Sequence, residues 1–167
     1  YVENNILQIT PASTNPRLTD EAKKKGWTTV LRTCGRDDIQ GVVAGNFLAS
    51  KYKGKKVAIL HDKSAYGQGI ADETKLNYNK AGGKEALYDS LQKGDKDFTA
   101  LISKMKSMTV DVVYVGSYHT EVGLMVKQAR EQGFKAQFIS EDALVTDEFW
   151  KISGPAGEGL LMTFAPD

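Results

Sequence analysis

Two short segments of the chain carry groups that suit the two charged ends of a small zwitterion. The segment PAST offers backbone N–H groups and two hydroxyls, a suitable grip for a carboxylate, from Ala12, Ser13 and Thr14. Much later in the chain, Glu141 and Asp142 offer a negative partner for an ammonium group, and such a charge-assisted hydrogen bond is stronger than a neutral one. The sequence therefore predicts a site for a small molecule that carries both charges.

Two tyrosines accompany these segments. Tyr66 and Tyr118 offer an apolar wall with a hydroxyl, or a π face for a cationic group. Each candidate also has a purely structural interpretation: PAST as a turn or a cap for the helix predicted over 18–25, the tyrosines as packed aromatics, and the acidic pair as a solvated loop. A shared location favours the binding interpretation, because each segment follows a predicted strand.

Motifs for catalysis or for metal and cofactor binding are incomplete in this sequence. His61 and His119 lack a third His or Cys at metal-ligand spacing, and neither the serine elbow G-x-S-x-G nor a Walker motif occurs. The glycines after Tyr66 lack the third glycine and the Lys-Ser/Thr of a phosphate loop. Cys34 has no histidine nearby in sequence, so a Cys-His mechanism is left only as an alternative. We expect a binding module without metal, cofactor or enzymatic activity.

Composition limits the classes of partner. The 22 Lys and Arg nearly balance the 21 Asp and Glu, giving a net charge of +1, so the broad basic field of a nucleic-acid-binding protein is not found. No apolar stretch approaches the ~18 residues of a membrane span. The opening YVENNILQIT does not read as a secretion signal, so we expect such a signal to be absent or already removed. The single cysteine excludes a disulfide within this sequence.

Short apolar runs alternate with amphipathic stretches along the chain. The patterns predict strands at 5–10, 27–33, 56–60, 85–91, 111–115, 136–140 and 159–164, and helices at 18–25, 38–53, 69–81, 97–108, 121–132 and 147–152. This alternation predicts βαβ units, and hence an α/β fold with a doubly wound, mainly parallel sheet and helices on both faces. The strand order is left open. In such sheets ligands bind outside the carboxyl ends of the strands.

Six runs of this sequence resemble the type I periplasmic binding proteins for branched-chain and related amino acids: ITPASTNPRLTD, LRTCGRDDIQG, VAILHDKSAYGQG, GDKDFTALISKMK, VVYVGSYHTE and EGLLMTFAPD. The likeness covers nearly the whole chain in order. It implies a periplasmic, two-lobed protein that captures an amino acid and delivers it to the permease of an ABC transporter. Two other classes are left as alternatives: the effector domain of a transcription regulator or receptor, and a small flavodoxin-like enzyme.

The resemblance implies ligand-binding positions in the PAST segment, the tyrosines and the acidic pair: Ala12, Ser13, Thr14, Tyr66, Tyr118, Glu141 and Asp142. In this family an acidic residue binds the ligand's ammonium, and spacing matches it to Asp142 better than to Glu141. Many relatives have glutamate there. The shorter aspartate implies a smaller or differently placed amine, such as proline or γ-aminobutyrate, in place of leucine.

The resemblance also implies a division of the chain. Residues 1–33 match the end of a first lobe and the approach to the hinge, 34–158 the second ligand-binding lobe, and 159–167 the return hinge strand. Receptors of this kind are considerably longer, and their serine-rich loop is not found here, so a fragment or single lobe is implied. Half a cleft lacks preorganisation and water exclusion. We therefore expect weak binding by the chain without its complementary lobe and, if the face left open is apolar, self-association.

Overall fold

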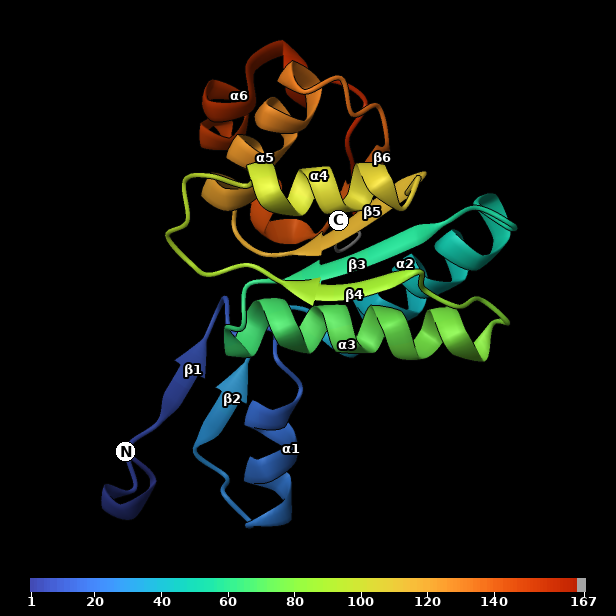
Figure 1. Cartoon of the computed structure of the whole chain (residues 1–167). Coiled ribbons are helices and arrows are strands. Elements are labelled where there is room, and N and C mark those ends of the chain that lie inside the picture. The colour runs from blue at the N-terminus through green and yellow to red at the C-terminus, as the bar shows by residue number, and fades with distance from the viewer. Residues whose placement is uncertain (165–167) are drawn as a thin grey trace.

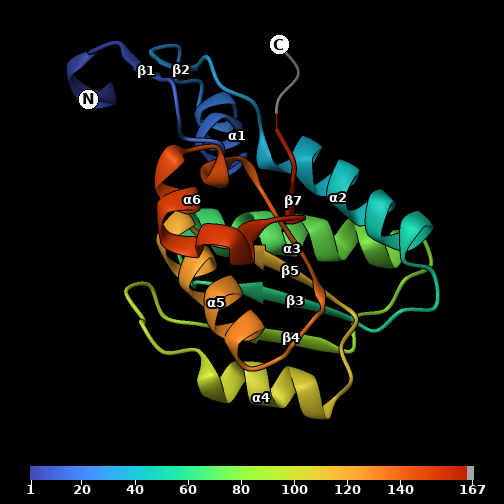
Figure 2. The same cartoon turned by 90° about the horizontal axis from the view of Figure 1, so that it is seen from above.

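The computed structural model describes residues 1–164 and shows a layered α/β fold (Figure 1). A five-stranded sheet runs in the order β4–β3–β5–β6–β7, and every neighbouring pair is parallel. Helices α2 (Asp37–Lys51) and α3 (Ala65–Lys80) cover one face, whereas α4 (Thr99–Ser107) and α5 (His119–Glu131) cover the other (Figure 2). The predicted fold class is confirmed.

The central strands of this sheet are buried from end to end. The five strands are β3 (Val57–His61), β4 (Leu87–Ser90), β5 (Val112–Gly116), β6 (Gln137–Ser140) and β7 (Leu161–Met162). Alternate residues of β3 and β5 belong to two separate hydrophobic clusters, Leu60 and Val113 to one and Ile59 and Tyr114 to the other. Because helices cover both faces, these strands are apolar without alternation.

A smaller unit projects from the end of this body at which α3 begins (Figures 1 and 2). It consists of β1 (Gln8–Thr10) and β2 (Val30–Arg32), paired in parallel, with α1 (Arg17–Lys24) between them in sequence. Its separate sheet accords with a boundary near residue 33, and the three-part division of the chain stays a prediction. The strand predicted at 159–164 is shorter in the structure, where only Leu161–Met162 form β7. Residues 165–167 of the predicted return segment lie outside the described part.

Helix α3 begins four residues before the predicted start at Gly69. Ser64 caps it, accepting a hydrogen bond from Gly67 N at 2.9 Å. A Cβ atom on Gly67 would lie 2.3 Å from Asp62 Oδ1 and 2.4 Å from the Gly116 carbonyl oxygen. This glycine therefore serves close packing of the helix against the strand ends, and Tyr66 lies in the first helical turn.

The remaining helical elements are short. Helix α6 (Asp147–Ser153) packs against α5, and single 3-10 turns occur at Val2–Asn4, Asp142–Leu144 and Gly154–Gly157. Among residues 1–164, no helix is long and apolar enough to cross a membrane.

Candidate functional site

A cleft of about 740 Å³ lies where the smaller unit meets the carboxyl ends of the main sheet. Its walls come from the PAST loop, the β2–α2 connection, the start of α3, the start of α5 and the loop after β6: Pro11, Ala12, Ser13, Thr14, Asn15, Thr33, Cys34, Gly35, Ser64, Ala65, Tyr66, Tyr118, Asp142, Ala143 and Phe164. Six of the seven predicted residues thus line one cleft, and Glu141 lies behind it. Asp142 is the one charged residue among these lining residues.

The PAST loop is closed on itself by the residue before it. The Thr10 hydroxyl accepts hydrogen bonds from Ala12 N at 3.3 Å and Ser13 N at 3.0 Å, and donates to Ser13 Oγ at 2.9 Å. These two amides, predicted as part of a carboxylate grip, are therefore already occupied. Thr14 remains: it is buried, and its hydroxyl oxygen has no hydrogen-bond partner among residues 1–164.

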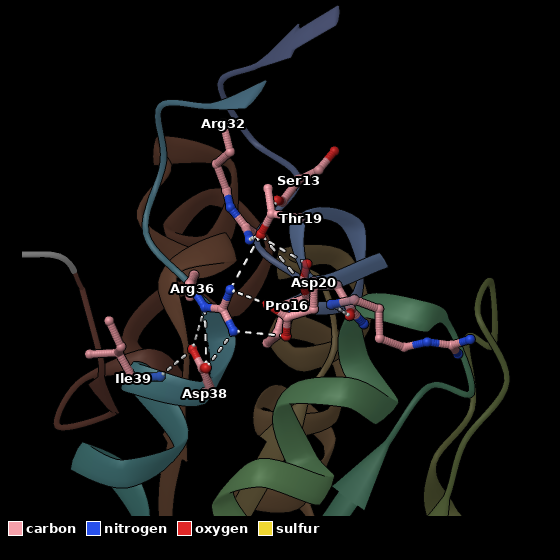
Figure 3. A network of polar contacts seen from close by, with 10 residues as sticks. Ser13, Pro16, Thr19, Asp20, Arg32, Arg36, Asp38 and Ile39 are labelled. Atoms are coloured by element: carbon pink, nitrogen blue, oxygen red, sulfur yellow. Dashed lines mark hydrogen bonds and ion pairs between the residues drawn. The ribbon is translucent and has the colours of Figure 1, made fainter. Parts of the chain in front are cut away.

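One arginine fastens the loop and a second joins the start of α2 to α1 (Figure 3), and neither is among the residues that line the cleft. Arg32 donates to the carbonyl oxygens of Ser13 at 2.8 Å and Asn15 at 2.9 Å. Arg36 pairs with Asp20 at 2.8 Å and with Asp38 at 2.8 Å, and these pairs lower the pKa of both carboxyls. Both guanidiniums are thus engaged away from the cleft.

On the opposite wall, Tyr66 bridges the two acidic residues. Its hydroxyl contacts Glu141 Oε2 and lies 2.5 Å from Asp142 Oδ1. Glu141 is fully buried and also accepts hydrogen bonds from Ser117 N at 3.2 Å and Ala143 N at 2.7 Å. These three contacts give both oxygens of the buried Glu141 carboxyl hydrogen-bond partners. Asp142, by contrast, lines the cleft.

The protonation state of this cluster follows from burial. Burial raises the pKa of Glu141 to about 8, against the opposing effect of its hydrogen bonds, and burial beside two carboxyls also raises the pKa of Tyr66. A single phenol proton cannot serve two carboxylate acceptors. A proton on Glu141, in line with its raised pKa, would supply the second hydrogen bond to the phenol oxygen.

Tyr118 completes an aromatic wall beside Tyr66. The ring centroids are 5.3 Å apart at an interplanar angle of 40°, within the range of favourable aromatic pairs. Lys93 Nζ lies 4.7 Å from the Tyr118 ring centroid. Tyr118 occupies the N-cap position of α5 in an extended conformation, and its side chain makes no capping hydrogen bond.

The histidines are engaged elsewhere. His61 Nδ1 accepts from Lys63 N at 3.1 Å, and His119 Nε2 lies 3.0 Å from Glu148. Residues 1–164 contain no cluster of three His, Cys, Asp or Glu able to hold a metal ion. Sequence analysis did not identify the buried carboxyl of Asp37, which lies next to the PAST loop. Its position at the start of an apolar helix gave no signal, because acidic residues are common in a first helical turn.

Comparison with known proteins identifies the family. A family model described as periplasmic binding protein matches residues 1–167. The chain belongs to this family. As a periplasmic binding protein it is 52% identical, over all 167 of its residues, to the Leu/Ile/Val-binding protein homolog 1 of Brucella suis biovar 1. It is 45% identical over 163 residues to a leucine-, isoleucine-, valine-, threonine-, and alanine-binding protein of Pseudomonas aeruginosa, with 98% of this chain and 43% of the relative covered.

Solved structures of periplasmic binding proteins share its fold. A leucine binding protein of Thermotoga maritima superposes with a TM-score of 0.85 at 31% identity, covering 96% of this chain and 45% of that one. A branched-chain amino acid substrate binding protein of Streptococcus pneumoniae, solved with isoleucine, gives 0.78 at 28% identity, covering 91% and 42%. The chain spans 44% of the Brucella relative, so it corresponds to less than half of each of these proteins.

Proposed function

We propose that this chain forms the ammonium-binding side of an amino-acid site in the substrate-binding component of an ABC transporter. The observation that carries the proposal is the cleft itself. Among its lining residues within 1–164, Asp142 is the one charged residue, and it lies against the Tyr66 and Tyr118 wall. The relatives support it, since their names describe binding proteins for leucine, isoleucine and valine. Capture in the periplasm and delivery to a permease belong to the same proposal.

The charges of the cleft favour an ammonium group over a carboxylate. Asp142 is negative, the amides of Ala12 and Ser13 are occupied, and Arg32 and Arg36 are engaged in other pairs. An anionic end placed here would meet a carboxylate and few free donors. We infer that most of the donors for the ligand's carboxylate come from a complementary lobe of the full-length protein.

The ligand is an amino acid of branched-chain size or smaller. The aromatic wall suits an apolar side chain or methylene chain, and the carboxylate on a short aspartate reaches less far than one on a glutamate would. We therefore place proline and γ-aminobutyrate beside leucine, isoleucine and valine as candidate ligands.

Isothermal titration of the full-length polypeptide that contains this chain tests the proposal. We expect one of these five amino acids to bind, and Asp142→Asn to weaken binding by at least about tenfold, because a charged hydrogen bond is lost. Asp147→Asn, the same change outside the cleft, is the matched control and retains affinity. Failure of all five to bind, or equal affinity in Asp142→Asn, contradicts the proposal.

A further inference from the structure

A lysine lies over the aromatic wall of the cleft without lining the cleft itself. Lys93 Nζ is 4.7 Å from the ring centroid of Tyr118, and that centroid is 5.3 Å from the ring centroid of Tyr66. Both tyrosines line the cleft, whereas Lys93 is not among its lining residues within 1–164. A positive charge therefore lies next to the wall that the side chain of a ligand would contact.

The loop between β4 and α4 holds Lys93 in this place. On one side of Lys93, Leu91 N donates to the His61 carbonyl oxygen at 2.9 Å. On the other side, Gly94 N donates to Glu121 Oε1 at 2.8 Å, and Glu121 is a buried residue of α5. Because the backbone is fixed both to the main sheet and to α5, the position of Lys93 follows from the fold and not from its side-chain contact alone.

The contact between Lys93 and Tyr118 affects what the ring can accept. The π face of a tyrosine attracts a cation, and Lys93 supplies one from the protein itself. A second cation that approaches the same ring from the cleft would meet the charge of Lys93, and like charges repel. The ring therefore suits an apolar group of the ligand better than a cationic one.

The cleft offers no second anion to a cationic side chain. Among the lining residues within the described part of the chain, Asp142 is the one charged residue, and in the proposed function it pairs with the ligand's ammonium group. A second ammonium group, at the end of the ligand's side chain, would lie at the tyrosine wall near Lys93 and without a counter-ion. Desolvating an unpaired charge is costly, whereas a neutral side chain has no such cost.

We propose that Lys93 is a specificity-determining residue, whose charge over Tyr118 disfavours amino acids that have a cationic side chain. The inference rests on the proposed function and adds a repulsive element to it. Specificity is a difference between two affinities, and a charge that opposes the wrong ligand contributes to that difference without contacting the right one.

The test compares two ligands that differ by one charged group. L-norvaline and L-ornithine have the same carbon chain, and L-ornithine carries a terminal ammonium group in addition. Competition titration in the full-length polypeptide, against the tightest-binding of the five candidate ligands, gives the dissociation constant of each. The discrimination ratio is the dissociation constant of L-ornithine divided by that of L-norvaline.

Three substitutions in this loop separate charge from shape. Lys93→Met removes the charge and nearly keeps the length of the side chain, so we expect the discrimination ratio to fall by about tenfold. Lys93→Arg keeps a cation over the ring and should keep the ratio within about twofold. Lys96→Met, the same change at another exposed lysine of the loop, is the matched control and should also keep the ratio within about twofold.

Salt gives a second readout that a structural role would not change. Lys93 is exposed, so ions screen its charge, and the Debye length falls from about 30 Å at 0.01 M to about 3 Å at 1 M ionic strength. We expect the wild-type discrimination ratio to fall over this range, and the ratio of Lys93→Met to change much less. If Lys93 served only the shape of the loop, its loss would lower the melting temperature and weaken both ligands equally.

The outcomes separate this inference from the proposed function. A lower ratio in Lys93→Met, with the wild-type ratio kept in Lys93→Arg and Lys96→Met, supports the inference. It is overturned, with the proposed function intact, by an unchanged ratio in Lys93→Met, by an equal fall in Lys96→Met, by a wild-type ratio that salt does not change, or by the absence of competition from L-ornithine in Lys93→Met. If the wild type binds none of the five candidate ligands, the proposed function fails and the inference falls with it.

Discussion

Two carboxyls share one phenol at the cleft, and their environments differ. Glu141 is fully buried with two backbone N–H donors, whereas its neighbour Asp142 lines the cleft. The two residues are adjacent in sequence, and they differ in direction: the Glu141 side chain points into the protein interior, whereas the Asp142 side chain points to the cleft. The buried carboxyl holds the phenol in place, and the carboxyl of Asp142, which lines the cleft, is the one that a ligand meets.

Glu141→Gln tests this division through the pH dependence of stability. The folded-state pKa of Glu141 is raised to about 8, above the ordinary pKa of 4.5 for this side chain, so the folded state holds a proton that the unfolded state releases. The free energy of unfolding therefore falls as pH rises from about 4.5 to 8. Asp37, with a pKa of about 6, adds to that fall only in the lower part of this range.

We expect Glu141→Gln to flatten the curve between about pH 6.5 and 8, where one proton contributes at most about 1.4 kcal/mol per pH unit. Urea unfolding at several pH values measures the slope. Tyr88→Phe, which removes a tyrosine hydroxyl bonded to Asp72 outside the cleft, is expected to keep the wild-type slope. An unchanged slope in Glu141→Gln would show that Glu141 is ionised in the folded state.

The length of the acidic side chain sets the position of the bound amine. Asp142→Glu extends the carboxylate by one methylene into the cleft, so the amine and the rest of the ligand must shift together. We expect the affinity ratio of leucine to γ-aminobutyrate to rise by about tenfold, the scale of one methylene in a specific pocket. Competition titration of the two ligands measures the ratio. No change in it would show that the aspartate does not select between these ligands.

At the scale of elements, the start of α3 organises the cleft. Ser64 caps the helix, Tyr66 follows in the first turn, and Gly67 permits contact with the ends of β3 and β5. Asn15 Nδ2 donates to the Ala65 carbonyl oxygen at 2.6 Å, which joins the PAST loop to this same turn. One helical turn thus links the smaller unit to the main sheet.

Gly67→Ala is expected to destabilise the protein by about 1–3 kcal/mol, because its Cβ would overlap Asp62 and the Gly116 backbone. Gly69→Ala is the matched control in the same helix: its Cβ would meet the Asn15 side chain at 2.8 Å, which can move, and alanine favours the helix. Urea unfolding compares the two variants. Equal destabilisation would show that helix geometry, not packing on the strands, decides the cost.

At the scale of the whole molecule, an apolar groove continues from the cleft. It encloses about 560 Å³ between α2 and β7, and shares Gly35, Asp142 and Phe164 with the cleft. On α2, Ile39 is 63% and Val43 is 56% exposed. Helix α2 is therefore apolar on its solvent-facing side as well as on the side that packs on the sheet. A helix of this kind is suited to burial on both sides.

The exposed groove leads us to expect self-association of this chain, as the sequence predicted for an apolar open face. Sedimentation velocity over a range of concentrations measures it, and a net charge of +1 offers little repulsion. Val43→Asp places a charge in the groove and should reduce association, whereas Lys51→Asp at the far end of α2 should not. A concentration-independent monomer mass contradicts the prediction.

Ligand binding should differ between this chain and the full-length polypeptide. The open cleft excludes water incompletely and supplies partners mainly for one end of an amino acid, so we expect the chain alone to bind at least about a hundredfold more weakly. Thermal shift with millimolar amino acids compares the two. Micromolar affinity in the chain alone would show that the complete site lies within these residues.

The sequence by itself determined the alternation of elements and the positions of the polar segments, since both depend on local periodicity and on residues that end strands. Because parallel strands share a carboxyl edge, it also placed Tyr66, Tyr118 and Asp142 at one edge of the main sheet, whereas PAST follows a strand of the separate two-stranded sheet. The start of α3 was predicted late, because glycines that serve packing resemble glycines that break helices.

Only the tertiary structure decided the strand order, the burial of Glu141 behind Asp142, the occupation of the PAST amides by Thr10, and the burial of Asp37. The Tyr66 contacts with Glu141 and Asp142 join residues 75 and 76 positions apart. Such contacts depend on how helices pack on the sheet. The type of a side chain sets its ordinary pKa, but its burial and partners, which shift that pKa, follow from the packing and not from its neighbours in sequence.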